Sequence, residues 1–259
     1  DRLITRIYGS PDVRQIDGIG GGTPLTSKLA IVGAASRRDA DISYTFGQVS
    51  LEENKIDYRP TCGNMAAAVG LFAAEEGYVE LTDSITIVRI FNTNTNNIIE
   101  AEIPVKNGKI QYDGTFSIDG VPGTSSCIMI NYLETGGAIT GNLLPTGNTK
   151  DSVKLDDGRK FDITVIDAAN VIVFVHANQL NIKGTEIGKN FNRKELLNTL
   201  EAIRVEAGIR VGLIKDKTAV TPYSHALPKI AVVSHPQSYI TNTGDVINLN
   251  KIDIVVRDI

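Results

Sequence analysis

One segment limits the folds open to this chain more than any other. Residues 64–76 form an alanine-rich run that is apolar on nearly every side of a helix, and Gly77 follows as a residue typical of helix ends. A helix with apolar residues all round is expected to be buried all round. Because the other apolar stretches have the pattern of strands, we predict an α+β fold in which a sheet wraps around this helix.

Short apolar runs separated by glycine-rich turns dominate the remaining chain. Alternation of apolar and polar residues predicts a strand over residues 42–49, and an Asn/Thr-rich turn predicts a hairpin between strands 84–91 and 98–105. Further strands are expected at residues 3–8, 29–32, 114–118, 126–133, 160–166, 171–175 and 229–234. A second helix is expected over residues 193–207, where leucines recur at helical spacing and Gly208 follows as a stop.

A stretch rich in glycine and threonine, residues 135–149, interrupts this pattern near the middle of the chain. It predicts a boundary between two domains of similar size, residues 1–135 and residues 136–259. A chain of 259 residues is long enough to bury a core without disulfide bonds or metal ions.

The composition excludes several classes of partner. A net charge of −4 and a pI near 5.5 leave no overall basic surface for nucleic acid. The longest apolar run, residues 65–74, is far shorter than the roughly 20 residues that a membrane span requires. Two cysteines, Cys62 and Cys127, are too few for a disulfide framework and indicate a reducing compartment. We therefore expect a cytoplasmic protein that acts on a small molecule, without nucleic acid or membrane partners.

The start of the apolar helix is the first candidate site. Cys62 precedes the helix, where the positive end of the helix dipole favours a thiolate. Backbone N–H groups of Gly63, Asn64 and Met65 are expected to point toward the same place and can bind a carboxylate. The alternative is that Cys62 is a small buried hydrophobic residue and that Asn64 only caps the helix.

A glycine-rich loop, residues 20–28, is the second candidate site. Three glycines, the hydroxyl residues Thr23 and Ser27, and Lys28 resemble an anion-binding loop, although the spacing of a nucleotide phosphate loop is absent. Lys28 precedes an apolar strand, where partial burial favours a neutral amine that can accept a proton. The alternative is a flexible turn with a solvated lysine.

Other polar residues give weaker signals. Asn170 lies in a turn-forming stretch and could present its amide to a ligand. The histidines His176, His225 and His235 lack the spacing of metal ligands, so no metal site is expected. A hydrolase that pairs Cys62 with one of these histidines is an open alternative. The sequence contains no cofactor motif, so no cofactor is expected.

Seven short motifs follow one another along the whole chain, and their order bears on the family of the protein. They are G-S-P-D at residues 9–12, Q-I-D-G at 15–18, the glycine loop ending at Lys28, T-C-G-N at 61–64, L-P-T-G-N at 144–148, D-A-A-N at 167–170 and L-E-A-I-R at 200–204. Together they resemble the PrpF family, the 2-methylaconitate cis-trans isomerases, which also includes methylitaconate and oxalomesaconate isomerases.

The resemblance implies a diaminopimelate epimerase-like fold of two domains, each a mixed sheet around a central helix. Family members usually extend before Asp1 and past Ile259, so the second central helix is expected to be missing from this chain. The resemblance also implies that Lys28 is the general base that removes an allylic proton from a di- or tricarboxylate. Cys62 would assist as an acid, base or hydrogen-bond partner, without a cofactor. A homodimer is compatible with these expectations.

Two further interpretations stay open. A racemase of the same fold typically uses two facing cysteines, one in each domain, and Cys127 lies in the first half without a Cys-Gly-Asn context. A non-catalytic carboxylate-binding protein would keep the pocket without turning over a substrate. One thiol and one lysine favour isomerisation over stereoinversion, while the non-catalytic protein stays an open alternative.

Overall fold

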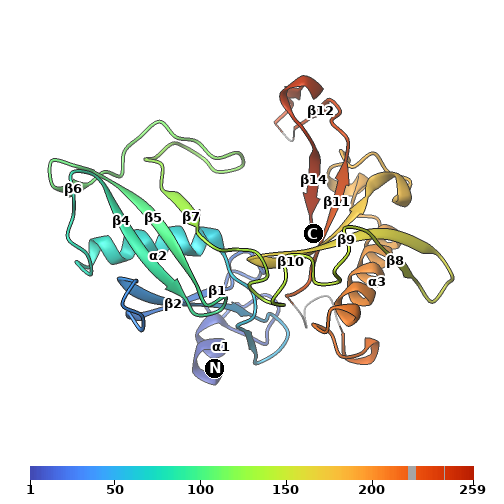
Figure 1. Cartoon of the computed structure of the whole chain (residues 1–259), viewed down its shortest axis with the longest axis horizontal. Helices are drawn as coiled ribbons and strands as arrows, with labels where there is room; N and C mark the ends of the chain where they lie inside the picture. Colours follow the sequence, from blue (N-terminus) through green and yellow to red (C-terminus); the bar gives the residue numbers. More distant parts are fainter. Residues whose placement is uncertain (221–225, 242) are drawn as a thin grey trace. The chain divides into compact units, whose positions relative to one another are not determined.

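The computed structural model describes residues 1–220, 226–241 and 243–259, and the chain divides into two compact units, Asp1–Thr135 and Gly136–Ile259 (Figure 1). Each unit has a sheet and a hydrophobic core of its own. None of the helices in these described residues is long and apolar enough to cross a membrane.

The first unit is built on a mixed, seven-stranded sheet. Its elements are α1 (Arg2–Tyr8), β1 (Lys28–Ala34), β2 (Ile42–Val49), β3 (Ile56–Asp57), α2 (Gly63–Glu75), β4 (Ser84–Asn92), β5 (Asn97–Lys106), β6 (Lys109–Ile110) and β7 (Met129–Tyr132). The strand order is β1-β2-β4-β5-β6, with β3 beside β2 and β7 beside β5. Strands β2 and β4 run parallel, whereas the other pairs are antiparallel. The strand over residues 42–49 and the hairpin around the Asn/Thr-rich turn are confirmed.

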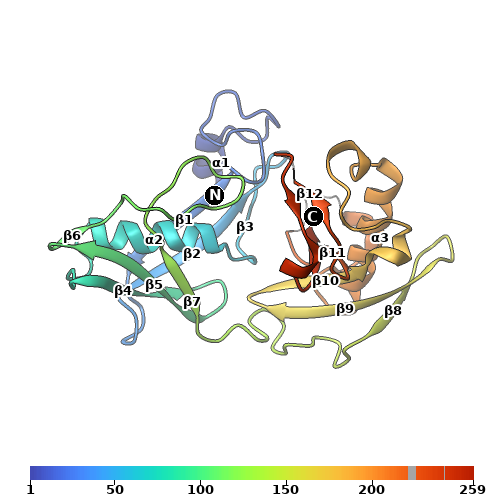
Figure 2. The same cartoon turned by 90° about the horizontal axis from the view of Figure 1, so that it is seen from above.

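Helix α2 lies across one face of this sheet (Figures 1 and 2). Its small residues let it approach the strands closely: a Cβ atom on Gly70 would lie 2.4 Å from the Cβ atom of Ala101 on β5. The prediction that this helix is buried all round is wrong, because Phe72 is 41% exposed and Ala68 is exposed too. The sheet covers one side of the helix, and small alanines tolerate exposure on the other.

The first residues form a helix rather than the strand predicted over residues 3–8. The buried side chains of α1 are Thr5 and Tyr8, which are three residues apart, as a helix requires. Gly9 then ends the helix in the left-handed conformation, with φ of 92°. The apolar residues Leu3 and Ile7, which suggested a strand, are exposed.

The second unit has a five-stranded sheet in the order β14-β11-β10-β9-β8. Its strands and α-helix are β8 (Asp151–Lys154), β9 (Lys160–Ala168), β10 (Asn170–His176), α3 (Lys194–Arg210), β11 (Lys229–Ser234) and β14 (Val255–Asp258), with a separate hairpin of β12 (Tyr239–Ile240) and β13 (Val246–Ile247). Helix α3 packs Leu200 and Ile203 against alternate residues of β9 and β10. Short 3₁₀ helices cover Ala177–Leu180, Gly188–Asn190, Lys217–Ala219 and Leu249–Lys251.

Two further predictions are wrong, one about the end of a helix and one about a strand. Helix α3 continues through Gly208 to Arg210, because this glycine does not adopt the left-handed conformation that ends a helix. Residues 114–118 form no strand, and only an isolated bridge joins Phe116 to Ser125.

Candidate active site

The structure brings Lys28 and Cys62 together. Lys28 begins β1, on the face of the sheet that α2 covers, since Ala30 and Val32 pack into the same core as that helix. Cys62 is the residue before the first turn of α2. The Lys28 Nζ atom lies 3.6 Å from the Cys62 Sγ atom and donates a hydrogen bond to it. Both side chains are half-buried, so the pair is reachable from solvent.

Backbone contacts hold Lys28 in place. The Tyr8 hydroxyl donates to the carbonyl oxygen of Lys28 at 2.5 Å. The carbonyl oxygen of Ser27 accepts from the backbone N–H of Val49 and from the side-chain amide of Gln48, both at 3.0 Å. The start of β1 is thus attached to α1 and to β2.

Cys62 is fixed from the opposite side. Asn92 is fully buried at the end of β4, and its side-chain amide donates to the Thr61 hydroxyl at 2.6 Å. The carbonyl oxygen of Cys62 accepts the first hydrogen bond of α2, from the N–H of Ala66 at 3.0 Å. These two contacts determine where the thiol lies relative to the helix end.

The N-terminus of α2 is open. Cys62 is the N-cap residue, no side chain caps the helix, and no acidic residue occupies the first turn. Gly63 and Asn64 are exposed and Met65 is half-buried, so the first N–H groups of a 13-residue helix face an accessible region. The alternative in which Asn64 caps the helix is therefore wrong. An uncapped helix N-terminus beside a lysine is well suited to a carboxylate.

Two tyrosines that the sequence reasoning missed border the same pair. Burial raises the pKa of Tyr44, and charge on Cys62 and Tyr132 raises it further. Burial also raises the pKa of Tyr132, again with a contribution from Cys62. Both phenols therefore stay protonated at neutral pH. The only sign in the sequence was a hydroxyl residue in each of two apolar strands, which more often reflects core packing.

The hydroxyl residues of the glycine loop form hydrogen bonds inside the protein. Ser27 is fully buried, and its one hydroxyl hydrogen has two acceptors within reach, Gln15 Oε1 at 2.7 Å and the carbonyl oxygen of Gly20 at 3.0 Å from Oγ. Thr23 is exposed and shares a hydrogen bond with the hydroxyl of Thr26 at 2.9 Å. The loop therefore presents Lys28, whereas nothing supports a substrate contact by Ser27, and the contact predicted for Thr23 stays a prediction.

Asn170 begins β10, and its contact with a ligand stays a prediction. The rings of His176 and His235 lie 5.2 Å apart, while His225 is outside the described residues. No group of three or more metal-ligating side chains gathers in the described part of the chain.

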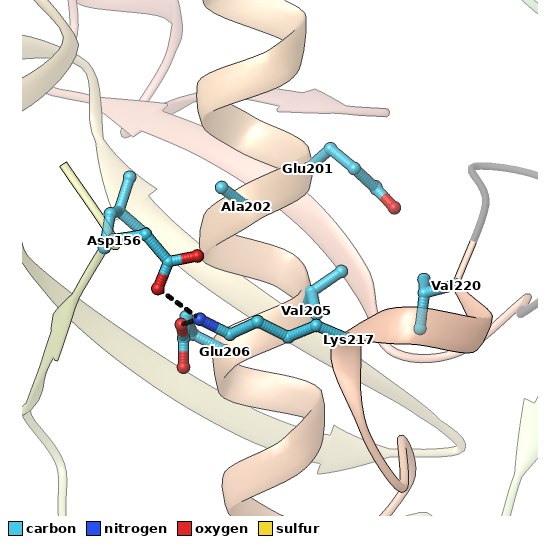
Figure 3. A pocket seen from close by; sticks show the side chains of 8 residues that line it. Asp156, Glu201, Ala202, Val205, Glu206, Lys217 and Val220 are labelled. Atoms are coloured by element: carbon cyan, nitrogen blue, oxygen red, sulfur yellow. Dashed lines mark hydrogen bonds and ion pairs between the residues drawn. The ribbon is translucent and has the colours of Figure 1, made fainter.

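A pocket of about 210 Å³ lies beside α3 in the second unit (Figure 3). Figure 3 shows Lys217 extended toward the carboxylates of Asp156 and Glu206, and it forms an ion pair with each. Glu201 also lines the pocket and is paired with Arg204, so three carboxylates face two cationic side chains. This charge disfavours an anionic substrate, in contrast to the region around Lys28.

Comparisons with known proteins identify the family of the chain. The model of the PrpF protein family matches residues 1–259. The 3-methylitaconate isomerase of Eubacterium barkeri is 43% identical over 259 residues, which are 99% of this chain and 68% of that relative. A crystal structure of methylitaconate-delta-isomerase matches with a TM-score of 0.80 and 42% identity, over 100% of this chain and 67% of its own.

A more distant match bears on the fold alone. A crystal structure of a hydroxyproline epimerase from Agrobacterium vitis has a TM-score of 0.51 and 12% identity, over 87% of this chain and 53% of its own. The expected epimerase-like fold class is confirmed by this match together with the isomerase structure. The expected enzyme class is confirmed at the level of the close relatives, which are named as isomerases.

Proposed function

The chain belongs to the PrpF family, and on this premise we propose that it shifts a double bond, or its geometry, in a small unsaturated di- or tricarboxylate. The observation that carries the proposal is the 3.6 Å approach of the Lys28 amine to the Cys62 thiol at the open N-terminus of α2. Similarity to a 3-methylitaconate isomerase and to a 2-methyl-aconitate isomerase makes methylitaconate and 2-methylaconitate the first substrates to test.

The reaction needs only a proton that leaves and returns. The N–H groups of Gly63, Asn64 and Met65 bind a substrate carboxylate and place the neighbouring carbon chain beside Lys28. The Lys28 amine takes a proton from the carbon next to the double bond, and the C–H electron pair spreads over the double bond onto the carboxylate as a dienolate. The helix N–H groups stabilise this charge.

The proton then returns at a different place or after a rotation. Protonation at the other end of the three-carbon unit, by the Lys28 ammonium or the Cys62 thiol, moves the double bond. Rotation about the former double bond before the proton returns to its first carbon changes the geometry instead. Atoms and charge balance in both cases, and no step requires a cofactor.

Three rival functions make different predictions. A racemase would invert a stereocentre by proton transfer between two facing thiols, so it would depend on Cys62 together with a second cysteine. A hydrolase would form an acyl-enzyme at Cys62 and turn over esters. A non-catalytic carboxylate-binding protein would bind the same acids without exchanging their protons.

Solvent-deuterium incorporation separates these functions. The protein is incubated in D₂O with 3-methylitaconate and 2-methylaconitate, and the acids are followed by mass spectrometry and ultraviolet absorbance. We expect deuterium incorporation with isomerisation for the natural chain, and loss of about 100-fold or more in Lys28→Ala. Lys106→Ala and Cys127→Ser are matched controls, since Lys106 is exposed at the end of β5 and Cys127 lies outside the pair. They should behave like the natural chain.

Three results would contradict the proposal. Equal exchange in Lys28→Ala and Lys106→Ala would remove Lys28 as the base. Binding without exchange would leave the non-catalytic function, and a trapped ester intermediate on Cys62 would favour the hydrolase.

A further inference from the structure

Tyr132 is placed at the open end of α2 by the sheet. It is the last residue of β7, and it pairs with Ile99 of β5 in an antiparallel ladder. Its hydroxyl oxygen lies 3.2 Å from the position that a Cβ atom on Gly63 would occupy. The phenol therefore lies directly beside the first residue of the helix, next to Cys62.

The hydroxyl of Tyr132 is available to a ligand. Among the described residues it makes no hydrogen bond, and it does not belong to the polar atoms that are fully enclosed. Tyr132 is half-buried, so one side of the ring packs in the core with α2 while the oxygen reaches the accessible region. A protonated phenol at this place has one hydrogen to donate.

We propose that the Tyr132 hydroxyl is a catalytic donor that binds a carboxylate oxygen of the substrate held at the N-terminus of α2. The inference rests on the proposed function and assigns a role that the helix and the Lys28–Cys62 pair do not fill. The N–H groups of Gly63 and its neighbours point along the helix axis, while the phenol approaches from the side. Together they surround a carboxylate with donors in different directions.

The bond strengthens as the reaction proceeds. Removal of the proton sends negative charge onto the carboxylate oxygens, so a donor already in place stabilises the dienolate more than the substrate. Loss of the hydroxyl should therefore lower kcat as well as raise KM. Gly63 is part of the same arrangement, because a methyl group there would press against the phenol oxygen at 3.2 Å.

Tyr44 offers a matched control. It too is a phenol close to Cys62, but it is fully buried and its hydroxyl is enclosed without a hydrogen-bond partner in the described structure. A substrate cannot reach that oxygen. Tyr44→Phe and Tyr132→Phe therefore remove the same atom from two phenols near one thiol, with access to substrate as the difference.

The experiment compares both variants with the natural chain. We expect Tyr132→Phe to lower kcat/KM for 3-methylitaconate by about 10- to 100-fold, with part of the loss in kcat. Tyr44→Phe should stay within about twofold. Far-ultraviolet circular dichroism and thermal unfolding confirm that both variants are folded.

A binding measurement keeps this inference separate from the proposed function. Calorimetry with methylsuccinate, a saturated dicarboxylate that cannot isomerise, should show affinity for the natural chain and a loss of about tenfold in Tyr132→Phe only. This holds even if neither unsaturated acid is turned over. Unchanged kinetics and binding in Tyr132→Phe, or equal losses in both variants, would overturn the role of Tyr132.

Discussion

Replacement of Tyr44 by phenylalanine should make the first unit more stable, although it deletes an atom beside the candidate site. Tyr44 is 0% exposed on β2, and its ring packs with Ile42 and Phe46 in the core under α2. In the described structure its hydroxyl has no hydrogen-bond partner. In the unfolded chain the same hydroxyl is hydrated, so folding removes its hydrogen bonds to water and returns none.

The size of the effect follows from this exchange. A buried hydroxyl without a partner costs about 1–3 kcal/mol. Phenylalanine keeps the ring and its contacts, and the space left by one oxygen atom costs little at about 24 cal/mol per Å³ of cavity. We therefore expect the free energy of unfolding to rise by about 1 kcal/mol, which corresponds to roughly 4 °C in Tm for a unit of this size.

Urea unfolding followed by far-ultraviolet circular dichroism measures this change, because the chain contains no tryptophan for fluorescence. Tyr8→Phe is the matched control: Tyr8 is 9% exposed, and its hydroxyl donates to the carbonyl oxygen of Lys28 at 2.5 Å. That variant should lose about 1–2 kcal/mol, since it leaves a carbonyl without its donor. If Tyr44→Phe lost stability to the same extent, the Tyr44 hydroxyl would have a partner in solution and the reasoning would fail.

Two further changes test the packing of α2 and a charged loop of the second unit. Gly70→Ala should destabilise the first unit by about 1–3 kcal/mol, because its methyl group would lie 2.4 Å from the Ala101 Cβ atom; Gly33→Ala, which meets nothing within 4 Å, should change the urea midpoint little. Burial raises the pKa of Glu186, but bonds from backbone N–H groups, including those of Lys183 and Gly184, and the charge of Arg193 together outweigh it and hold the pKa below the ordinary value of 4.5. Because the pKa of Glu186 is lower in the folded state, its stabilisation is present above pH 4.5 and fades below it. Glu186→Gln should therefore flatten the pH dependence of the free energy of unfolding in that acidic range. An unchanged pH profile would contradict the lowered pKa of Glu186.

Local chemistry made parts of the fold predictable. The hairpin of β4 and β5 follows from its Asn/Thr-rich turn and from alternation on both strands, and the ladder runs from Ser84↔Val105 to Asn92↔Asn97. The approach of Lys28 to Cys62 rested instead on a family resemblance, since the two residues lie 34 positions apart. No local pattern could have shown that β1 begins beside the start of α2.

Features that depend on what a segment packs against could not be predicted. Residues 3–8 are apolar enough for a strand, but Thr5 and Tyr8 are the side chains that become buried, at helical spacing. Ser27 lies in a loop with the composition of an anion-binding site, yet its hydroxyl forms a hydrogen bond with Gln15 inside the protein. Tyr44 and Tyr132 occur in apolar strands, where a hydroxyl residue carries no local sign of a site.

The position of the site can also be argued from stability alone. Helix α2 begins without a capping side chain, although a cap contributes about 1 kcal/mol. In the described structure, Tyr132 has a hydroxyl without a hydrogen-bond partner next to Gly63, where a larger residue would press against the phenol. Each of these two features leaves donors unused, and both lie next to Cys62. A bound carboxylate supplies the partners that the uncapped helix and the free phenol lack. This favours a carboxylate site at the start of α2 over the acidic pocket beside α3.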